Sequence, residues 1–193
     1  MIKPENEWIL ILDYGSQYNQ LIARRVRESQ VYCEIHPYNV DLKTFESRPP
    51  SGVILSGGPM SVNDPGAPEL NDAVFELDVP VLGICYGLQI MTHSISPGSV
   101  SDAEKREFGR ARISVLKRNE LFAGLPDESI VWMSHGDHIV TLPDQFEVIA
   151  RTNNAPVAAV KHSLRPVYGV QFHPEVVHTE YGREMLHNFV RNI

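Results

Sequence analysis

The sequence has few cysteines, no long apolar run and no excess of basic residues, and each shortage argues against a class of protein. Two cysteines among 193 residues, Cys33 and Cys85, are too few for a disulfide framework and suit a reducing compartment. No apolar run approaches the roughly 18 residues of a membrane span. The opening MIKPENEW also lacks the basic-then-apolar pattern of a signal peptide. We therefore expect a cytoplasmic protein with no membrane partner.

The charge balance is acidic. The 24 Asp and Glu residues outnumber the 17 Lys and Arg residues and give a formal net charge of −7. This argues against broad binding to the phosphate backbone of nucleic acid, which needs a basic face. Ordinary apolar, aromatic and charged fractions indicate a globular protein, and the length suits one sizeable core. Because the sequence contains no linker, repeat or low-complexity segment, we expect a single domain over residues 1–193.

The first half of the sequence alternates apolar, strand-like runs with helical patterns. In chain order, we expect a strand at 8–15, a helix at 16–29, strands at 31–38 and 51–59, a helix at 67–77, a strand at 79–84 and a helix at 86–95. Ser16 is the expected N-cap of the first helix. Apolar strands that alternate with helices indicate a parallel sheet covered on both faces.

The second half contains strand-like runs joined by short turns, followed by one helix. The expected strands are 111–116, 129–134, 146–152, 157–162 and 166–172, and the expected helix is 182–193. Nothing separates these runs from the first half, so we interpret them as further strands of the same unit. The predicted fold class is α/β, with a single domain and an open, mostly parallel or mixed sheet flanked by helices.

The stretch Gly83-Ile84-Cys85-Tyr86-Gly87 places a cysteine between two glycines at a predicted strand-to-helix junction. In a nucleophile elbow, written G-x-S-x-G, the strained turn presents the nucleophile above the sheet edge, and its neighbours at −2 and +2 have no room for a Cβ. The following helix N-terminus favours a thiolate. The alternative for Cys85 is a structural cysteine at the end of a buried strand. That is our expectation for Cys33, which has no glycines around it.

A nucleophilic cysteine needs a base, and the base needs an orienting group. His173 follows a predicted strand in VQFHPE. Residues i and i+2 of an extended segment point the same way, so Glu175 can reach the imidazole of His173. Pro174 has a fixed φ and stiffens the segment between them. The alternative is a turn that closes the strand and leaves Glu175 in solvent.

The third part of such a site is a set of donors for an oxyanion. The segment Ser56-Gly57-Gly58-Pro59 follows the strand GVIL, so a parallel sheet places it at the same carboxyl edge as Cys85. Glycine backbone can approach a substrate closely and direct N–H groups at a developing negative oxygen. The expected donors are the N–H groups of Gly58 and Tyr86. The segment is not a phosphate-binding P-loop, because GxxxxGK[ST] is absent.

These motifs meet at one sheet edge and predict an acyl-transfer enzyme with a Cys–His–Glu triad. At the same residues the sequence resembles the class I (triad) glutamine amidotransferases, with GICYGLQ, SGGP and FHPE matching their nucleophile, oxyanion and His/Glu motifs. The resemblance implies a flavodoxin-like fold. Within that family, several segments resemble the glutaminase domain of GMP synthetases, namely ILDYGSQYNQLIARRVRE, ILSGGPMSV, EFGRARI, VWMSHGDHI and YGVQFHPEVVHT.

The resemblance implies a reaction. Cys85 would attack the side-chain amide of L-glutamine, His173 would pass a proton to the leaving ammonia, and Glu175 would orient His173. Gly58 and Tyr86 would stabilise the tetrahedral oxyanion, and water would then hydrolyse the glutamyl thioester. The same matching assigns the binding of glutamine to Gly57, Gln89 and the backbone of Ser134 and His135.

The segment MSHGDHI invites two interpretations. His135 and His138 could suggest a metal, but no cysteine or carboxylate spacing matches a metal site, so we expect none. We prefer an exposed His-Gly-Asp loop that meets a partner domain, with Asp137 as a contact. Trp132, just before this segment, is expected in the core.

The resemblance also implies a partner. In the whole enzyme, ammonia passes to a synthetase domain that uses ATP and Mg to aminate XMP to GMP. The present sequence lacks the SGGxDS loop of ATP pyrophosphatases, so we expect no cofactor in this domain and a synthetase domain or subunit supplied from elsewhere. The opening segment favours an excised domain over a natural subunit. One departure from the family is Pro97-Gly98, where Leu-Gly-Gly is expected.

Other functions stay open at this point. The chain could be the glutaminase of anthranilate or carbamoyl-phosphate synthesis, although DYGSQY and MSHGD argue against both. A cysteine peptidase or γ-glutamyl hydrolase would keep the elbow, and a non-catalytic regulatory module would keep the fold but be expected to lose part of the triad. We also expect the isolated chain to hydrolyse glutamine slowly, because a partner completes the site.

Overall fold

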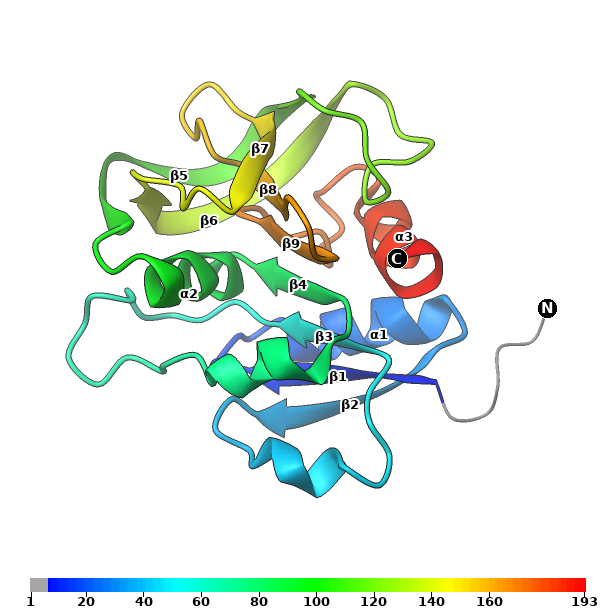
Figure 1. Ribbon diagram of the computed structural model, residues 1–193. Helices are drawn as coiled ribbons and strands as arrows, with labels where there is room; N and C mark the ends of the chain where they lie inside the picture. The colour runs from blue at the N-terminus through cyan, green and yellow to red at the C-terminus, as the bar shows by residue number, and fades with distance from the viewer. Residues whose placement is uncertain (1–6) are drawn as a thin grey trace.

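The computed structural model describes the backbone of residues 7–193, and the side chains of that range apart from 102–106 (Figure 1). Within these residues one sheet of nine strands has the order β2-β1-β3-β4-β9-β8-β7-β5-β6. The strands are β1 (Trp8–Asp13), β2 (Tyr32–Pro37), β3 (Gly52–Leu55), β4 (Val81–Ile84), β5 (Val100–Val115), β6 (Glu128–Ile139), β7 (Phe146–Arg151), β8 (Ala159–His162) and β9 (Val167–Val170). The α-helices of the described range are α1 (Asn19–Glu28), α2 (Tyr86–Ile95) and α3 (Gly182–Asn192).

The strands from β2 to β9 in the sheet order pair in parallel and are covered by helices on both faces. In β1, Ile9 and Ile11 pack with residues of α1 and α3, whereas Leu10 and Leu12 pack with residues of α2. Because side chains alternate across a strand, a sheet covered on both faces requires a continuous apolar run. The expected parallel sheet is confirmed. None of the helices in the described residues is long and apolar enough to cross a membrane.

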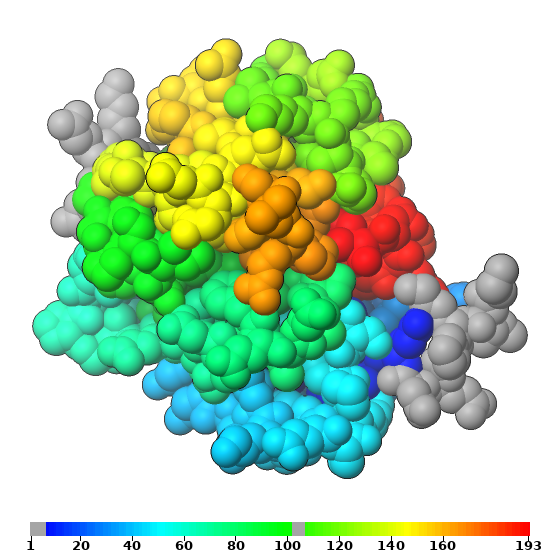
Figure 2. All heavy atoms as spheres, in the orientation of Figure 1, coloured from blue at the N-terminus to red at the C-terminus, as the bar shows by residue number. Residues whose placement is uncertain are grey.

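The remaining strands extend the same sheet through antiparallel pairs, from β9 to β8, β7, β5 and β6. On the face shown in Figure 2, yellow and orange atoms from the second half of the chain lie directly against green atoms from the first half. The expectation that the second half adds strands to one α/β unit is therefore confirmed. The carboxyl ends of β3, β4 and β9 lie at one edge, where the three motifs follow their strands.

The end of β6 corrects one expectation. MSHGDHI (133–139) is not an exposed loop, because it continues β6 and every second side chain from Val131 to Ile139 is buried. Gly and Asp favour turns, but the two-residue alternation of a strand continues through them here. Trp132 is not in the core either. It lies on the opposite, partly exposed face of β6, with its ring 4.7 Å from that of His178 between centroids.

Two predicted helices also differ from the structure. The segment 67–77 is irregular until Asn71, whose side chain accepts a hydrogen bond from the Ala73 N–H and begins a 3₁₀ helix at Asp72–Leu77. Ser16 is not the N-cap of α1, because Tyr18 occupies that position. The Ser16 hydroxyl oxygen instead accepts from the Tyr18 N–H within the preceding turn, which delays the start of the helix.

Candidate active site

Cys85 lies at the sharp turn between β4 and α2. Its φ of 52° and ψ of −105° are a backbone conformation that residues with a side chain rarely adopt. A Cβ at Gly83 would lie 2.7 Å from the Gly87 carbonyl oxygen, and a Cβ at Gly87 would collide with the Leu55 carbonyl oxygen. Both glycines are therefore required by close backbone contacts, and the predicted elbow is confirmed.

His173 and Glu175 are in direct contact beside this thiol. The imidazole Nδ1 lies 2.8 Å from Glu175 Oε1, and Glu175 is fully buried. The alternative with Glu175 in solvent is therefore wrong. Because Nδ1 faces the carboxylate, Nε2 is left for Cys85, with which the imidazole also interacts.

The backbone of this segment is held by its neighbours. The His173 N–H donates to the Trp132 carbonyl at 3.0 Å, which ties the base to β6. The Thr179 hydroxyl donates to the His173 carbonyl at 2.6 Å, and Arg25 Nε of α1 donates to the Glu175 carbonyl at 3.2 Å. Elements from both ends of the sequence thus fix the position of the imidazole.

The charge of His173 is set by opposing effects. Burial by itself lowers the pKa of His173, but hydrogen bonds to Cys85 and Glu175, together with the negative charges of both, raise this pKa well above its ordinary value. The arrangement can therefore hold a thiolate beside an imidazolium. In that form the sulfur is nucleophilic and the histidine carries the proton that a leaving group needs.

The glycine loop after β3 closes one side of the triad. A Cβ at Gly57 would lie 3.2 Å from His173 Cε1 and 3.8 Å from Cys85 Cβ. A Cβ at Gly58 would lie 2.8 Å from the Tyr14 carbonyl oxygen. Side chains have little room at either position, so the loop meets the triad through its backbone.

Tyr86, the second predicted oxyanion donor, is the first residue of α2, where N–H groups have no acceptor within the helix. Its ring lies beside that of Tyr14, with centroids 5.7 Å apart, and its hydroxyl donates to the Pro68 carbonyl at 2.6 Å. The backbone of Tyr86 thus adjoins Cys85 while its side chain anchors the preceding loop. The use of the Gly58 and Tyr86 N–H groups by an oxyanion stays a prediction.

A cavity of about 720 Å³ lies in front of the triad. It brings together most of the residues that the sequence assigned to the reaction or to glutamine, namely Cys85, His173, Gly58, Gln89, Ser134 and His135. The other lining residues are 15–18, 59–61, Asp64, Phe108, Gly136 and Asp137. Gly57 and Tyr86 adjoin Cys85 without lining this cavity. Binding of glutamine by these residues stays a prediction.

Asp137 corrects a further expectation. Asp137 is 7% exposed and lines the cavity, so it does not lie in an exposed loop, and its contact with a partner domain stays a prediction. Its backbone carbonyl accepts hydrogen bonds from Gln89 Nε2 at 3.3 Å and from His135 Nδ1 at 2.7 Å. His135 Nε2 faces the buried Glu107 carboxylate at 3.7 Å. Both imidazole nitrogens therefore face protein groups, and no cluster of three or more His, Cys, Asp or Glu in the described chain could hold a metal ion.

Two residues beside the triad were missed in the sequence. Tyr18 packs edge-on against the imidazole of His173, with ring centroids 5.4 Å apart. Gln171 is 1% exposed, and its Nε2 lies 3.6 Å from Cys85 Sγ. The alternation that identified Glu175 applies equally two residues before His173 and could have found Gln171. No comparable sequence signal links Tyr18 to His173, because the two residues lie far apart in the chain.

Comparison with known proteins identifies the family. The glutamine amidotransferase class-I model matches residues 10–193. The glutamine-hydrolysing GMP synthase of Bacillus velezensis is 51% identical over 98% of this chain, and that of Solidesulfovibrio magneticus is 54% identical over 100% of it. The match covers 37% of each of these relatives, so the chain spans little more than a third of their length.

Solved structures agree with the sequence match. A protein from Thermoplasma acidophilum, described as a candidate GMP synthase subunit, superposes with a TM-score of 0.83 at 33% identity, over 97% of this chain and 94% of that one. A glutamine amidotransferase from Thermotoga maritima has the same fold, with a TM-score of 0.69 at 19% identity over 90% of this chain and 78% of that one. The chain belongs to the class-I glutamine amidotransferases.

Proposed function

We propose that this protein hydrolyses the side-chain amide of glutamine and supplies the ammonia for amination of XMP to GMP. The observation that carries the proposal is the Cys85 thiol at a strained elbow, beside a His173 imidazole whose other nitrogen faces the buried Glu175. Relatives about half identical over nearly the whole chain are named glutamine-hydrolysing GMP synthases, which supports glutamine as the substrate.

In the first half of the proposed reaction, the Cys85 thiolate attacks the δ-carbonyl carbon of glutamine and forms a C–S bond. The carbonyl electron pair moves to the oxygen, which accepts hydrogen bonds from the Gly58 and Tyr86 N–H groups. When this pair returns, the C–N bond breaks. The departing nitrogen takes the proton of His173 Nε2, so ammonia leaves and a glutamyl thioester remains.

In the second half, water attacks the thioester carbon and gives its proton to the now neutral His173. The C–S bond then breaks, glutamate leaves, and the thiolate–imidazolium pair is restored. Glu175 remains ionised throughout, because its role is to orient the imidazole and stabilise its positive charge. Gln89, Ser134 and His135 line the same cavity and would hold the amino-acid end of glutamine, and Gly57 leaves space for the imidazole.

We further propose that an ATP-pyrophosphatase domain or subunit uses the ammonia. That part would bind ATP, Mg and XMP, and residues 1–193 would supply only the glutaminase. The support is the length of the curated relatives, of which this chain covers 37%. We place the protein in the cytoplasm, with neither nucleic acid nor a membrane as a partner.

The test is covalent capture by a glutamine-mimicking diazo ketone, followed by intact-mass spectrometry. We expect one adduct on the wild type and on Cys33→Ala, and none on Cys85→Ala. An adduct that forms only after a GMP synthetase partner is added would support a site completed by docking. No adduct under either condition would overturn the catalytic proposal in favour of a regulatory module. Amination of XMP by a supplied synthetase, compared with formation of anthranilate or carbamoyl phosphate by theirs, tests the pathway separately.

A further inference from the structure

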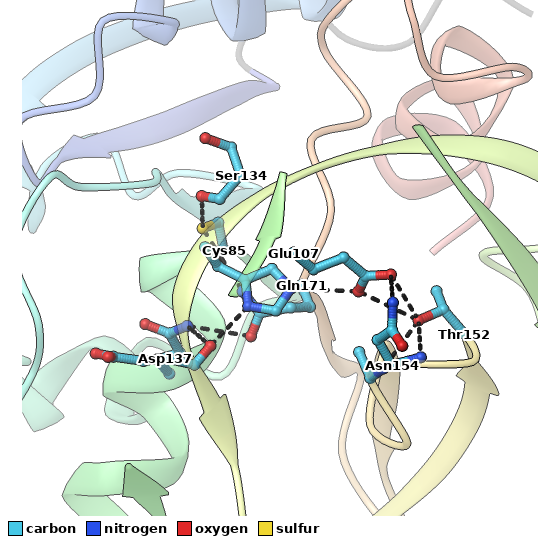
Figure 3. A network of polar contacts seen from close by, with 10 residues as sticks. Cys85, Glu107, Ser134, Asp137, Thr152, Asn154 and Gln171 are labelled. Atoms are coloured by element: carbon cyan, nitrogen blue, oxygen red, sulfur yellow. Dashed lines mark hydrogen bonds and ion pairs between the residues drawn. The ribbon is translucent and has the colours of Figure 1, made fainter. Parts of the chain in front are cut away.

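A chain of buried polar groups begins at the Cys85 sulfur and includes Gln171, to which the reaction described above assigns no role (Figure 3). Gln171 Nε2 lies 3.6 Å from Cys85 Sγ, and Gln171 Oε1 accepts a hydrogen bond of 3.1 Å from Gln89 Nε2. Gln89 Nε2 also donates to the Asp137 carbonyl at 3.3 Å. Because Gln171 and Gln89 are 1% and 3% exposed, bulk water does not compete for these contacts.

The far end of this chain fixes the direction of each hydrogen bond. The Asp137 carbonyl can only accept, so Gln89 must turn its NH₂ group toward it. The same NH₂ group reaches Gln171, which must present its carbonyl oxygen to Gln89 and its own NH₂ to Cys85. A flip of either amide would set two donors or two acceptors face to face. The Gln171 amide is therefore held as a donor to the sulfur.

Besides His173, two polar groups contact the sulfur, and they favour different protonation states. The Ser134 carbonyl oxygen, 3.7 Å from Sγ, can only accept a hydrogen bond and is therefore matched to a thiol. The Gln171 NH₂ group donates, and such a bond strengthens when its acceptor is charged. When the thiol ionises, Cys85 loses its hydrogen bond to the Ser134 carbonyl, and the hydrogen bond that it accepts from the Gln171 amide becomes stronger.

We propose that Gln171 is a positioning residue for the nucleophile. Its NH₂ group, oriented by Gln89 and the Asp137 carbonyl, donates to the Cys85 sulfur and holds the thiolate where it can attack. This inference deepens the proposed function and rests on Cys85 being its nucleophile. Gln171 does not line the cavity and acts only through the sulfur. His173 supplies the opposite charge and moves the proton, whereas Gln171 supplies a neutral donor that stays in place.

The test measures the sulfur itself, without glutamine. The rate of alkylation of Cys85 by iodoacetamide is followed against pH by peptide mass spectrometry in the wild type, Gln171→Glu and Gln171→Met. Gln171→Glu keeps an acceptor for Gln89 but replaces the donor beside the sulfur with a negative charge. We expect its alkylation midpoint to move at least about one pH unit upward, with a rate about tenfold lower near neutral pH. Gln171→Met removes the donor without adding charge and should shift the midpoint less, in the same direction.

Gln145→Glu is the matched control. Gln145 is exposed in the turn before β7, so the same change of charge there should leave the profile unchanged. Buried Cys33 serves as an internal reference in every variant. Coincident profiles for folded Gln171→Met, Gln171→Glu and wild type would overturn the proposal. If Gln171→Glu does not fold, Gln171→Met decides. If neither variant folds, Gln89→Met decides, because it frees the Gln171 amide to flip. Its alkylation midpoint must then move upward, by less than the shift expected for Gln171→Glu, or the proposal fails.

The outcome is separable from that of the proposed function. Iodoacetamide reports on the sulfur whether or not glutamine is the substrate, whereas the diazo ketone reports on the glutamine pocket. A shifted alkylation profile without a diazo ketone adduct would support the role of Gln171 and reject glutamine. A diazo ketone adduct together with an unshifted alkylation profile would support glutamine as the substrate and reject the role of Gln171. Where glutamine is turned over, Gln171→Met should lower kcat and leave KM nearly unchanged, because Gln171 does not contact the substrate.

Discussion

The surroundings of Cys33 and Cys85 differ although both thiols are buried, at 1% and 5% exposure. The Cys33 thiol in β2 donates to the Ala23 carbonyl at 3.5 Å, and burial raises the pKa of Cys33, with Arg27 partly opposing the change. Cys85 is approached by the Gln171 amide and the His173 imidazole at the start of a helix. Burial is therefore common to both thiols, and the donors and positive charges around Cys85 distinguish the proposed nucleophile from Cys33.

The largest expected contrast is in activity. Cys85→Ala should reduce glutamine hydrolysis by at least about 10⁴-fold, because removal of the nucleophile of a triad leaves only the binding site. Cys33→Ala should retain wild-type activity. Release of ammonia from glutamine, assayed with the synthetase partner present, measures both. Equal losses in the two variants would show that the contrast between the cysteines has no catalytic meaning.

The next largest effect concerns the group that orients the base. Glu175→Gln keeps the size of the side chain but removes the negative charge 2.8 Å from His173 Nδ1. We expect kcat to fall by about 10²- to 10⁴-fold, because the imidazole loses its orientation and its stabilised positive charge. Steady-state kinetics measures the fall. Glu147→Gln, in β7 with its side chain 37% exposed, is the control and should leave kcat unchanged.

The same pair predicts a pH dependence of stability. The folded-state pKa of His173 is raised, so its contribution is fully present below the unfolded value of about 6.5 and is lost as pH rises through the folded value. The difference in free energy of unfolding between wild type and Glu175→Gln should therefore be largest near pH 6 and shrink toward alkaline pH. Urea denaturation at several pH values measures it. A difference in free energy of unfolding that grows with pH would contradict a raised pKa of His173 in the folded protein.

The smallest effect belongs to Cys33. Cys33→Ala removes a buried sulfur and should cost about 1 kcal/mol of unfolding free energy near neutral pH. Since burial raises the pKa of Cys33, wild type should lose stability once the unfolded thiol ionises above about pH 8.5. Cys33→Ala should lack this alkaline loss. If the free energies of unfolding of the two proteins fall in parallel as the pH rises through that range, Cys33 makes no such contribution.

The sequence predicted those parts of the site that depend on short-range backbone geometry. Gly83 and Gly87 predict the elbow. A residue without a side chain is needed at both positions because the backbone makes close contacts there. Glu175 follows from the two-residue alternation of an extended segment. Gln171 obeys the same rule, but its orientation depends on Gln89 and on the Asp137 carbonyl, which are far away in the sequence. A single sequence carries no sign of such a chain of contacts.

The failures of prediction arise where tertiary contacts override local signals. His-Gly-Asp in MSHGDHI resembles a turn, yet pairing with β5 keeps it in β6 and turns His135 and Asp137 inward. Asp137 therefore forms part of the cavity wall and does not lie in an exposed loop. The segment 67–77 has apolar residues at helical spacing, but the Asn71 side chain caps a shorter 3₁₀ helix. The parallel sheet was expected from the alternation of apolar strands with helices, whereas the length of β5 and β6 depends on their pairing.

The positive φ of Cys85 has a consequence for how this protein responds to selection. A residue with a side chain held in that conformation costs of the order of 1–3 kcal/mol, and glycine adopts it with little strain. Cys85→Gly should therefore yield a more heat-resistant protein that catalyses nothing. We expect a library screened for thermal tolerance alone to discard the thiol, and the proposed nucleophile to persist only where the product of its reaction is needed.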